Sequence, residues 1–490
     1  MSEEIKKLEP KEVWKHFYSL TQIPRPSGHE KEVEAFLVNF GKEHNLETIK
    51  DKAGNVIIRK PATKGMENKT GVILQAHVDM VPQKNSDVVH DFTKDPIDAY
   101  IDGEWVKARG TTLGSDNGMG AAAIMAILES KTLEHGPLEA LFTATEETGM
   151  DGANGLKPGV LKGDILLNLD SETEGEFFMG CAGGLDANID FKFKPQPVPK
   201  GYKSFTLSVK GLKGGHSGMD INLGRGNAIK IMFRYLNRAK KQWKIQLADV
   251  TVDGLRNAIP REAFSTILVP ENKVDDIIKC VAKYEAIVNN ELGAVEDHIE
   301  IKLTPVKMPK FMINNPVQMR LIRSIIACQN GVIRMSKEMP GVVETSSNLA
   351  IVKSSIKSGV GNIEVKCLLR SSVDSSKDAL AANIGAAFEL AGAEAYFDGA
   401  YPGWKPNANS AIVKLAHKVY KKKFNKEPKI TAVHAGLECA ILGAKYPNWD
   451  MMSFGPTLEH PHSPDERVNI KSVGVFYDFL CTLLKNIPEK

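Results

Sequence analysis

The residues best suited to chemistry lie just beyond three apolar segments that the sequence predicts to be buried strands. In a strand, residues two apart point to the same face, so His77 and Asp79 are expected to emerge together. Ligand sites in open α/β sheets lie beyond the carboxyl ends of the strands, so the three groups should converge on one rim. The segments and the ionisable residues that follow them are Val72–Gln75 with His77 and Asp79, Leu138–Thr143 with Glu146 and Glu147, and Ile165–Leu169 with Asp170 and Glu172.

A fourth acidic residue, Asp116, lies in the turn-forming segment Gly114-Ser-Asp-Asn-Gly, just before an alanine-rich helix predicted over Met119–Glu129. Its carboxylate would point from the loop toward the same rim. Taken alone, Asp116 would suit a helix cap. Because so many carboxylates in one place repel one another, the combination requires a neutralising cation. Carboxylate and imidazole ligands together suit zinc or manganese, so the sequence predicts a site for divalent metal ions.

Histidines in the C-terminal part of the chain could supply a further neutral ligand. His460 and His462 lie in one polar loop before the last predicted helix, Val473–Leu484. His434, with Glu438 about one helical turn later, forms a rival pair of ligands. The spacing of these residues does not choose among the three histidines.

The elements that must position these residues follow two kinds of pattern. In the first third of the chain, short apolar runs alternate with helices, which predicts an α/β domain with a mostly parallel sheet. After Gly180-Cys-Ala-Gly-Gly the strands alternate apolar and polar residues, which predicts an antiparallel α+β domain. A similar series of helices and strands occurs twice there and suggests two related halves. After Pro402 the first pattern returns, so residues 1–186 and 403–490 are predicted to form one domain, split by an inserted domain of residues 187–402.

The first two helices are separated by a proline-rich break. The first is predicted over Glu12–Gln22 and is interrupted by Ile23-Pro-Arg-Pro-Ser-Gly. Ser27, at the end of this break, is predicted to cap the second helix.

Composition restricts the class of protein. The chain has 490 residues, of which 42% are hydrophobic and 25% charged, as in globular proteins with a large core. Its 63 basic and 60 acidic residues balance to +3, which argues against a nucleic-acid-binding surface. The six cysteines are scattered without a CxxC pair and predict reduced thiols rather than a disulfide framework.

Two further observations bear on the compartment. The longest apolar run in the first third of the chain, Ala121–Leu128, is far shorter than the roughly 20 residues of a membrane span. The N-terminus is charged and has no apolar segment typical of a signal peptide. We therefore expect a soluble, cytoplasmic protein that binds neither membranes nor nucleic acid.

Along nearly its whole length, and in matching order, the chain resembles the co-catalytic metallopeptidases of the M20 family. The segments that carry this resemblance are His77-Val-Asp79, Gly114-Ser-Asp116-Asn-Gly, Glu146-Glu147-Thr-Gly and Leu169-Asp170-Ser-Glu. Three others resemble its aminoacyl-histidine dipeptidase branch, also called Xaa-His or cytosol non-specific dipeptidases. They are Gly214-Gly-His216-Ser-Gly, Gly436-Leu-Glu438-Cys and His462-Ser-Pro-Asp-Glu.

The resemblance implies a site for two divalent metal ions, zinc in the first place, for which cobalt or manganese can substitute. Asp116 matches the carboxylate that bridges both ions. His77 and Asp170 match the remaining ligands of one ion, and Glu147 and His462 match those of the other. The position of His462 within Gly-Pro-Thr-x-x-x-x-His-Ser-Pro-Asp-Glu favours it over His460.

The resemblance also implies two catalytic residues beside the ligands. Glu146 matches the general base, which can take a proton from the attacking water and pass it to the leaving amine. Asp79 matches the residue that orients the imidazole of His77.

Three residues of the inserted domain match substrate-binding residues of the family's lid. His216 matches a histidine that stabilises the tetrahedral oxyanion. Asn257 matches an asparagine near the scissile group. Arg370 matches an arginine that binds the C-terminal carboxylate of the substrate, for which a planar guanidinium is well suited.

The activity implied is hydrolysis of the peptide bond of unblocked dipeptides by a metal-bound hydroxide, with Xaa-His dipeptides such as β-alanyl-histidine among the substrates. An M20 aminoacylase, deacetylase or tripeptidase on the same scaffold is the alternative, because metal ligands do not set substrate range. The resemblance further suggests a homodimer formed through the lid, although the second half of this long lid could stand in for a partner. The native metal and the exact dipeptide preference stay open.

Overall fold

The computed structural model describes residues 3–490, which fold into two compact units. The first unit comprises Met1–Gly180, Trp404–Ala432 and Leu437–Lys490, and the inserted unit comprises Cys181–Gly403 and Val433–Gly436. The sequence places the boundaries at residues 186 and 402 and does not predict the return of residues 433–436 to the inserted unit. That return is held by the backbone amide of Ala182, which donates hydrogen bonds to the carbonyls of Val433 and Ala435.

Within the described residues, the first unit contains an eight-stranded sheet. In sheet order its strands are β1 (Glu47–Lys50), β2 (Val56–Lys60), β6 (Leu138–Thr143), β3 (Val72–His77), β7 (Ile165–Asn168), β23 (Asp450–Ser453), β8 (Glu176–Cys181) and β22 (Lys429–Val433). Strands β6, β3, β7 and β23 pair in parallel, whereas β1–β2, β2–β6 and β8–β23 are antiparallel. The predicted parallel sheet is therefore its central part.

Strands β3, β6 and β7 end close to one another at the same edge of the sheet. Every residue of β3 and β6 is buried, as expected for strands covered on both faces. In the parallel register His77 lies opposite Thr143, and Gln75 lies opposite Asn168. The segments that follow β3, β6 and β7 therefore leave the sheet side by side.

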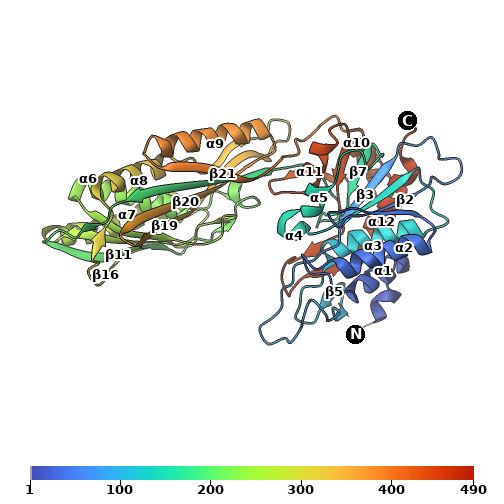
Figure 1. The fold of residues 1–490 in the computed structure, drawn as a ribbon, viewed down its shortest axis with the longest axis horizontal. Coiled ribbons are helices and arrows are strands. Elements are labelled where there is room, and N and C mark those ends of the chain that lie inside the picture. The colour runs from blue at the N-terminus through green and yellow to red at the C-terminus, as the bar shows by residue number, and fades with distance from the viewer. Residues whose placement is uncertain (1–2) are drawn as a thin grey trace. The chain divides into compact units, whose positions relative to one another are not determined.

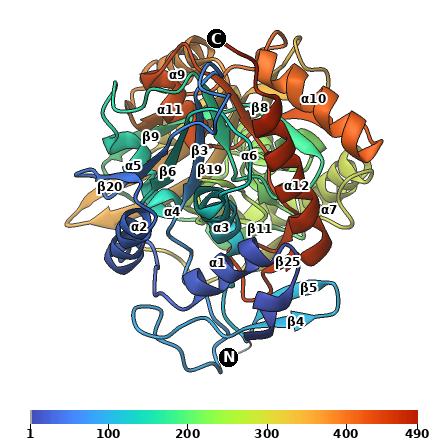
Figure 2. The same ribbon diagram turned by 90° about the vertical axis from the view of Figure 1, so that its right-hand side faces the viewer.

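Helices flank this sheet, as Figures 1 and 2 show. They are α1 (Lys11–Thr21), α2 (Lys31–Glu43), α3 (Ser115–Glu129), α4 (Glu146–Gly149), α5 (Asp151–Gly155), α10 (Ala411–Phe424), α11 (Glu438–Lys445) and α12 (Ile470–Asn486). Helix α3 is buried along almost its whole length between α1 and β3, which explains its alanine-rich, uniformly apolar sequence. Helices α10 and α12 pack together, and Phe479 of α12 stacks on Phe177 of β8 at 5.1 Å.

A small four-stranded sheet, which the sequence did not predict, positions the loop of His462. Its strands in order are β24 (Leu458–Glu459), β25 (Arg467–Asn469), β5 (Trp105–Ala108) and β4 (Ala99–Asp102). Strands β24 and β25 are antiparallel, with Glu459 opposite Arg467, and these two side chains form an ion pair. Residues 460–466 are therefore the closed loop of a β-hairpin.

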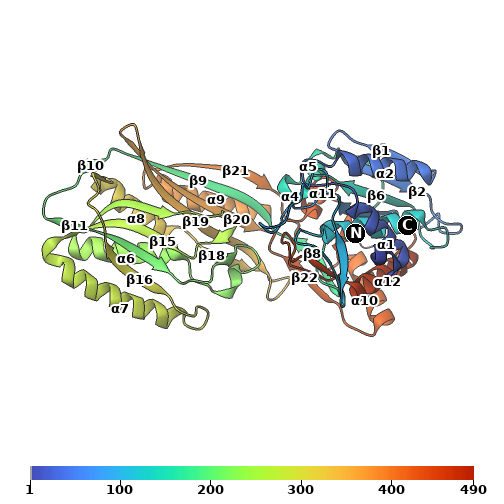
Figure 3. The ribbon, with the colours of Figure 1, turned by 90° about the horizontal axis from the view of Figure 1, so that it is seen from below.

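The inserted unit is an antiparallel sheet with helices packed against it (Figure 3). In sheet order its strands are β16 (Glu300–Pro305), β11 (Tyr202–Lys210), β15 (Ala263–Pro270), β13 (Gln246–Val252), β19 (Val343–Lys357), β20 (Val360–Ser371), β9 (Gly183–Phe193) and β21 (Glu394–Tyr401), and β18 (Gly331–Met335) pairs with β19. The helices are α6 (Ala228–Trp243), α7 (Val274–Leu292), α8 (Asn315–Ala327) and α9 (Asp374–Glu389).

The inserted unit consists of two halves with the same topology. One half runs β11-α6-β13-β15-α7-β16, and the other runs β9-α8-β19-β20-α9-β21. They meet where β13 pairs antiparallel with β19, at Thr251 with Lys353 and Val252 with Val352. Strand β9 precedes the whole of the other half in the chain, so the halves are interleaved. This interleaving explains why the sequence shows no repeat of fixed period.

Two negative findings concern residues 3–490. No helix in this range is long and apolar enough to cross a membrane. None of the six cysteines, all within the same range, forms a disulfide, in line with the reduced thiols that their spacing predicts.

Candidate metal centre

His77, the last residue of β3, lies between two kinds of acceptor. Its Nδ1 faces the backbone carbonyl of Asp79 at 3.2 Å and a carboxylate oxygen of the same residue at 3.4 Å. Its Nε2 lies 3.1 Å from Oδ1 of Asp116 and 3.4 Å from Oδ1 of Asp170. Oxygens that can only accept therefore lie at both ring nitrogens, and they raise the pKa of His77 well above its ordinary value although burial opposes this. If Nε2 gave its lone pair to a cation held by the two carboxylates, the ring would keep its proton on Nδ1, toward Asp79.

A second imidazole, that of His462, approaches the same carboxylate from another side. Its Nε2 lies 2.9 Å from Oε2 of Glu147 and 3.3 Å from Oδ2 of Asp116. The two oxygens of Asp116 therefore face different histidines, Oδ1 toward His77 and Oδ2 toward His462. This is the arrangement that a carboxylate bridging two ions requires.

These contacts form groups whose potential ligand atoms all lie within 4.8 Å of one another. The groups found among residues 3–490 are His77, Asp116 and Asp170; Asp116, Glu147 and His462; and His77, Glu146 and Glu147. Neither His434 nor His460 belongs to any of them. Of the three histidines that spacing left open, the structure brings His462 to the carboxylates.

The donor set fits divalent cations. Oε1 of Glu147 is buried and has no hydrogen-bond partner within the protein, although buried polar atoms nearly always have one. Together with the shared Asp116 it provides carboxylate oxygens beside imidazole nitrogens, the combination that zinc, manganese and cobalt accept. The residues present therefore fit a two-metal centre.

Asp79 joins the segments that follow β3 and β6. It is fully buried, and its carboxylate accepts hydrogen bonds from the backbone amides of Glu146 at 2.9 Å and Glu147 at 3.2 Å. Burial alone would raise its pKa, but the interactions with His77 and these donors lower the pKa to about 2. Asp79 thus stays ionised and holds both glutamates in place.

Ser27 is a partner of Asp79 and not the predicted helix cap. Helix α2 begins only at Lys31, and Glu30 occupies its N-cap position. The hydroxyl of Ser27 instead donates to Oδ2 of Asp79 at 2.8 Å. The prediction was wrong because Pro26 and Ser27 belong to a segment that pairs with the residues after β3, at Met80.

Asp170 is oriented by a residue that the sequence analysis did not select. Asn117 donates from its side chain to the carboxylate of Asp170 and, at 3.0 Å, to the carbonyl of Leu169. Asp116 and Asn117 have non-helical dihedral angles inside the first turn of α3. This distortion turns both side chains toward the rim while the regular helix begins just after them.

The electrostatics show a surplus of negative charge at this rim. Burial and the neighbouring carboxylates raise the pKa of Glu147 and that of Asp170, and they raise the pKa of Glu146 well above its ordinary value. Hydrogen bonds to Asp116 and Glu147 raise the pKa of His462 to about 11. The carboxylates therefore attract positive charge strongly, as a cation-binding centre must.

A buried polar network lies beneath the rim. Oε2 of Glu438, the first residue of α11, accepts hydrogen bonds from Gln75 and Thr143, each at 2.6 Å. Glu438 is fully buried, and this burial raises its pKa to about 8. The rival pairing of His434 with Glu438 is not observed, because His434 belongs to the inserted unit and bonds to Ser346 Oγ at 2.7 Å.

Within the inserted unit, His216 and Asn257 are neighbours. The strands β12 (Gly215–His216) and β14 (Ala258–Ile259) pair antiparallel, and Ser217 donates its amide to the carbonyl of Asn257 at 2.7 Å. Nδ1 of His216 accepts from the amides of Gly218 and Met219 at 3.3 and 3.1 Å. An accepting Nδ1 carries no proton, so the ring presents its N–H at Nε2.

Arg370 lies near His216 in the same unit. It is buried on β20, and its Nη1 donates to the hydroxyl of Tyr401 at 3.1 Å, whereas its Nε has no partner. Burial and the charge of Arg370 lower the pKa of His216, and they lower that of His434 to about 3. The inserted unit therefore gathers all three predicted substrate-binding residues, His216, Asn257 and Arg370, on its own.

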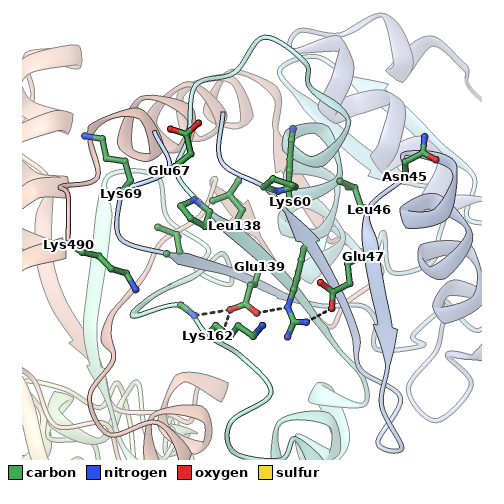
Figure 4. A pocket seen from close by; sticks show the side chains of 16 residues that line it. Asn45, Leu46, Glu47, Lys60, Glu67, Lys69, Leu138, Glu139, Lys162 and Lys490 are labelled. Atoms are coloured by element: carbon green, nitrogen blue, oxygen red, sulfur yellow. Dashed lines mark hydrogen bonds and ion pairs between the residues drawn. The ribbon is translucent and has the colours of Figure 1, made fainter. Parts of the chain in front are cut away.

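A pocket of about 530 Å³ lies at the opposite, amino ends of the same central strands (Figure 4). Val72 and Leu138, the first residues of β3 and β6, line it. Its buried carboxylate, Glu139, accepts from Arg59 Nε at 2.9 Å and from two backbone amides. Because Glu139 is paired with Arg59 and no histidine is among the residues that line it, this pocket lacks the donor set of the metal centre.

Comparison with known proteins identifies the family. Residues 73–486 match the peptidase family M20/M25/M40. The chain belongs to this family. This M20 peptidase is 48% identical, over 99% of its own length and the full length of the relative, to the cytosol non-specific dipeptidase of Escherichia coli strain K12.

Solved structures agree with this assignment. The aminoacylhistidine dipeptidase of Vibrio alginolyticus superposes with a TM-score of 0.93 at 47% identity, covering 99% of both chains. The aminopeptidase PepT of Bacillus cereus superposes with a TM-score of 0.63 at 14% identity, covering 98% of this chain and 99% of its own, which shows the shared fold alone. The split α/β unit with an inserted α+β unit is thus the architecture of M20 peptidases.

The sequence analysis missed several residues that position the M20 site. Ser27, Asn117 and Gln75 each lie within or beside a segment that it quoted, but their side chains are polar rather than ionisable. A search restricted to potential metal ligands passes over them. Adjacency could have found Gln75 and Asn117, because each lies within two residues of a proposed ligand in the chain. Ser27 gave no such signal, because only the bridge between Pro26 and Met80 brings it beside Asp79.

Proposed function

We propose that this M20 peptidase is a two-metal dipeptidase that hydrolyses unblocked dipeptides, Xaa-His dipeptides included. The observation that carries the proposal is Asp116, whose two oxygens face His77 and His462 separately. The high identity to a cytosol non-specific dipeptidase and to an aminoacylhistidine dipeptidase supports the substrate class.

In this proposal His77, Asp116 and Asp170 hold one ion, and Asp116, Glu147 and His462 hold the other. Zinc is the proposed metal, with cobalt or manganese able to replace it. When bound, the two ions would lower the pKa of a coordinated water toward about 7 and polarise the carbonyl of the substrate. Asp79 keeps the proton of His77 on Nδ1 and thereby keeps Nε2 available.

Glu146 is the proposed general base, a role that requires an ionised carboxylate, and two cations bound beside it would favour that form. It directly precedes a proposed ligand, and its amide is fixed by Asp79 at 2.9 Å. Glu146 takes one proton from the water as its oxygen bonds to the carbonyl carbon, and then gives that proton to the amide nitrogen as the C–N bond breaks. The products are two free amino acids, and Glu146 returns to its starting state.

Three residues of the inserted unit are proposed to bind substrate. The Nε2–H of His216 is a donor suited to the developing oxyanion, since Nδ1 is occupied by two backbone amides. Arg370, with an unpartnered buried Nε, is suited to the C-terminal carboxylate. Asn257, beside His216, is proposed to contact the scissile group.

A panel of substrates tests the proposal. It contains β-Ala-His, Gly-His, Ala-Ala, Gly-Gly-His, an N-acetyl amino acid and the C-terminal amide of Gly-His, each assayed with zinc, manganese or cobalt. We expect cleavage of the three dipeptides and little of the others, because the two capped substrates lack a free amine or a free carboxylate and Gly-Gly-His is one residue longer than a dipeptide. Preferred cleavage of Gly-Gly-His or of the N-acetyl amino acid would replace the proposal by a tripeptidase or an aminoacylase.

Location and assembly complete the proposal. The name of the Escherichia coli relative supports a cytoplasmic location, which fractionation of cells would test. Homodimerisation through the inserted unit stays a prediction, and sedimentation of the purified protein would decide between monomer and dimer.

A further inference from the structure

The carboxylate of Glu466 connects the loop of His462 to the loop of Asp116. Glu466 is only 2% exposed and follows His462 by four residues in the β24–β25 hairpin loop. It accepts five hydrogen bonds from residues 113–116. These come from the amides of Leu113 at 2.7 Å and Gly114 at 3.0 Å to Oε2, and from the amide of Ser115 at 2.7 Å, its hydroxyl at 2.6 Å and the amide of Asp116 at 3.2 Å to Oε1.

This bonding saturates the carboxylate. An ionised carboxylate offers about four acceptor positions, and all are directed at one short segment. Hydrogen bonds to an ionised group are roughly twice as strong as neutral ones, so the loop of Asp116 and the loop of His462 are joined firmly. Glu466 itself makes no contact with the proposed ligand atoms of the metal centre.

Arg25 holds the same segment from its other side. Its guanidinium is buried and donates to the carbonyl of Gly114 at 2.5 Å and to the carbonyls of Val78 and Asp79 at 2.9 and 3.2 Å. Gly114 has φ +70°, and a Cβ there would lie 2.6 Å from Nη2 of Arg25. The segment before Asp116 is thus fixed by an anion through its amides and by a cation through a carbonyl.

We propose that Glu466 is a positioning residue that sets the separation between Asp116 and His462 and thereby the affinity of the metal position formed by Asp116, Glu147 and His462. The inference rests on the proposed two-metal function. His462 is joined to Asp116 through Glu466, whereas His77 and Asp170, the other ligands of the neighbouring position, are oriented by Asp79 and Asn117. Because Asp116 belongs to both positions, loss of Glu466 should disturb both, but it should weaken the position of His462 more than the position of His77 and Asp170.

Titration of metal-free protein with zinc, in competition with a chromophoric chelator, tests this inference without any substrate. Glu466→Gln keeps the shape of the side chain but replaces one acceptor oxygen by an NH₂ group, which faces N–H donors. We expect the Kd of one of the two ions to rise about 10- to 100-fold while the other changes less than about threefold. Glu466→Asp keeps both oxygens but is shorter. Its Kd for the weakened ion should lie between that of Glu466→Gln and that of the wild type.

Glu139→Gln is the matched control. Glu139 is also a buried carboxylate of the first unit, 7% exposed, and accepts from the amides of Lys162 and Gly163 at 2.6 and 2.8 Å (Figure 4). It lies at the amino end of β6, away from the ligands that follow the carboxyl end. Glu139→Gln should lose thermal stability as Glu466→Gln does but bind both ions with unchanged affinity.

Two outcomes would overturn the inference. One is unchanged zinc affinity at both positions in Glu466→Gln, and the other is an equal loss at both. Should Glu466→Gln not yield folded protein, Ser115→Ala removes only the 2.6 Å hydroxyl bond, and it must weaken the same single position severalfold. A wild-type protein that binds two ions but cleaves no dipeptide would contradict the proposed function and leave this inference standing.

Discussion

The two ends of the central sheet contain the same kind of residue in opposite circumstances. At the amino ends, Glu139 of β6 accepts from Arg59, which also donates to Glu47 at 2.5 Å (Figure 4). At the carboxyl ends, Asp116, Glu147 and Asp170 meet only two imidazoles and no arginine or lysine side chain among their recorded ion pairs within residues 3–490. The same strands thus end in carboxylates paired with arginine on one side and in carboxylates that outnumber their imidazole partners on the other.

This difference separates structural carboxylates from functional ones. A buried carboxylate is costly unless it is paired, and the amino end meets that cost with arginine and backbone amides. At the carboxyl end, burial and mutual repulsion raise the pKa of Glu147 and of Asp170 instead. An excess of buried carboxylates over their cationic partners therefore distinguishes the end of the sheet that suits a bound cation.

Removal of metal from the carboxyl-end site should change the activity more than any substitution. Treatment with a chelator should abolish dipeptide hydrolysis, and zinc, manganese or cobalt should restore it, because the carboxyl-end carboxylates require cations for their chemistry. Free metal at 100 times its Kd should also stabilise the fold by about 2.7 kcal/mol. Turnover that survives complete metal loss, verified by elemental analysis, would contradict the two-metal assignment.

Removing the proposed base should have the next largest effect. Glu146→Gln preserves shape but cannot accept a proton, so kcat should fall by about 10²–10⁴-fold while two ions per chain are retained. The measurement is steady-state kinetics with metal analysis of the same sample. Glu139→Gln, from the other end of β6, should keep kcat within about twofold. Normal turnover in Glu146→Gln would remove the residue from the mechanism.

Asp79→Asn should have an intermediate effect. The amide cannot accept from both glutamate amides and from His77 as the carboxylate does, so metal affinity or kcat should fall about 10- to 100-fold. Ser27→Ala removes a single hydrogen bond to Asp79 and should cost severalfold less. Equal effects of the two substitutions would show that Asp79 does not orient His77.

Glu438→Gln should have the smallest effect, and one that depends on pH. Burial raises the pKa of Glu438 to about 8, above its ordinary value of 4.5. Between these values the folded protein retains a proton that the unfolded chain has lost, so this contribution to stability is complete below about pH 4.5 and is lost as the pH rises toward 8. The amide cannot ionise.

Urea unfolding of metal-free protein at pH 5.5 and pH 8 would measure this effect. Relative to wild type, the free energy of unfolding of Glu438→Gln should rise by on the order of 2 kcal/mol between pH 5.5 and pH 8. Glu139→Gln, which removes a carboxylate paired with Arg59, serves as the control. If Glu438→Gln were instead stabilised relative to wild type more at pH 5.5 than at pH 8, the result would contradict a neutral, buried Glu438.

The sequence predicted the strands before the ligands better than the residues that support those ligands. Leu138–Thr143 was predicted with the bounds that β6 has, because a continuous apolar run is distinctive. Ser27 was predicted wrongly as a cap, since its true partner, Asp79, is 52 residues away. The polar loop of His462 was predicted, but the hairpin that closes it was not, because β24 and β25 are two and three residues long.

By itself, the sequence determined the local pattern, namely apolar strands that end in histidines and carboxylates, and the motifs of an M20 peptidase. It could do so because strand periodicity and motif spacing are properties of neighbouring residues. Only the tertiary structure decided that both oxygens of Asp116 face a histidine, that Glu466 joins the loops of Asp116 and His462, and that His434 bonds to Ser346 in the inserted unit. These contacts join residues up to 353 positions apart in the chain, and folding alone brings them together.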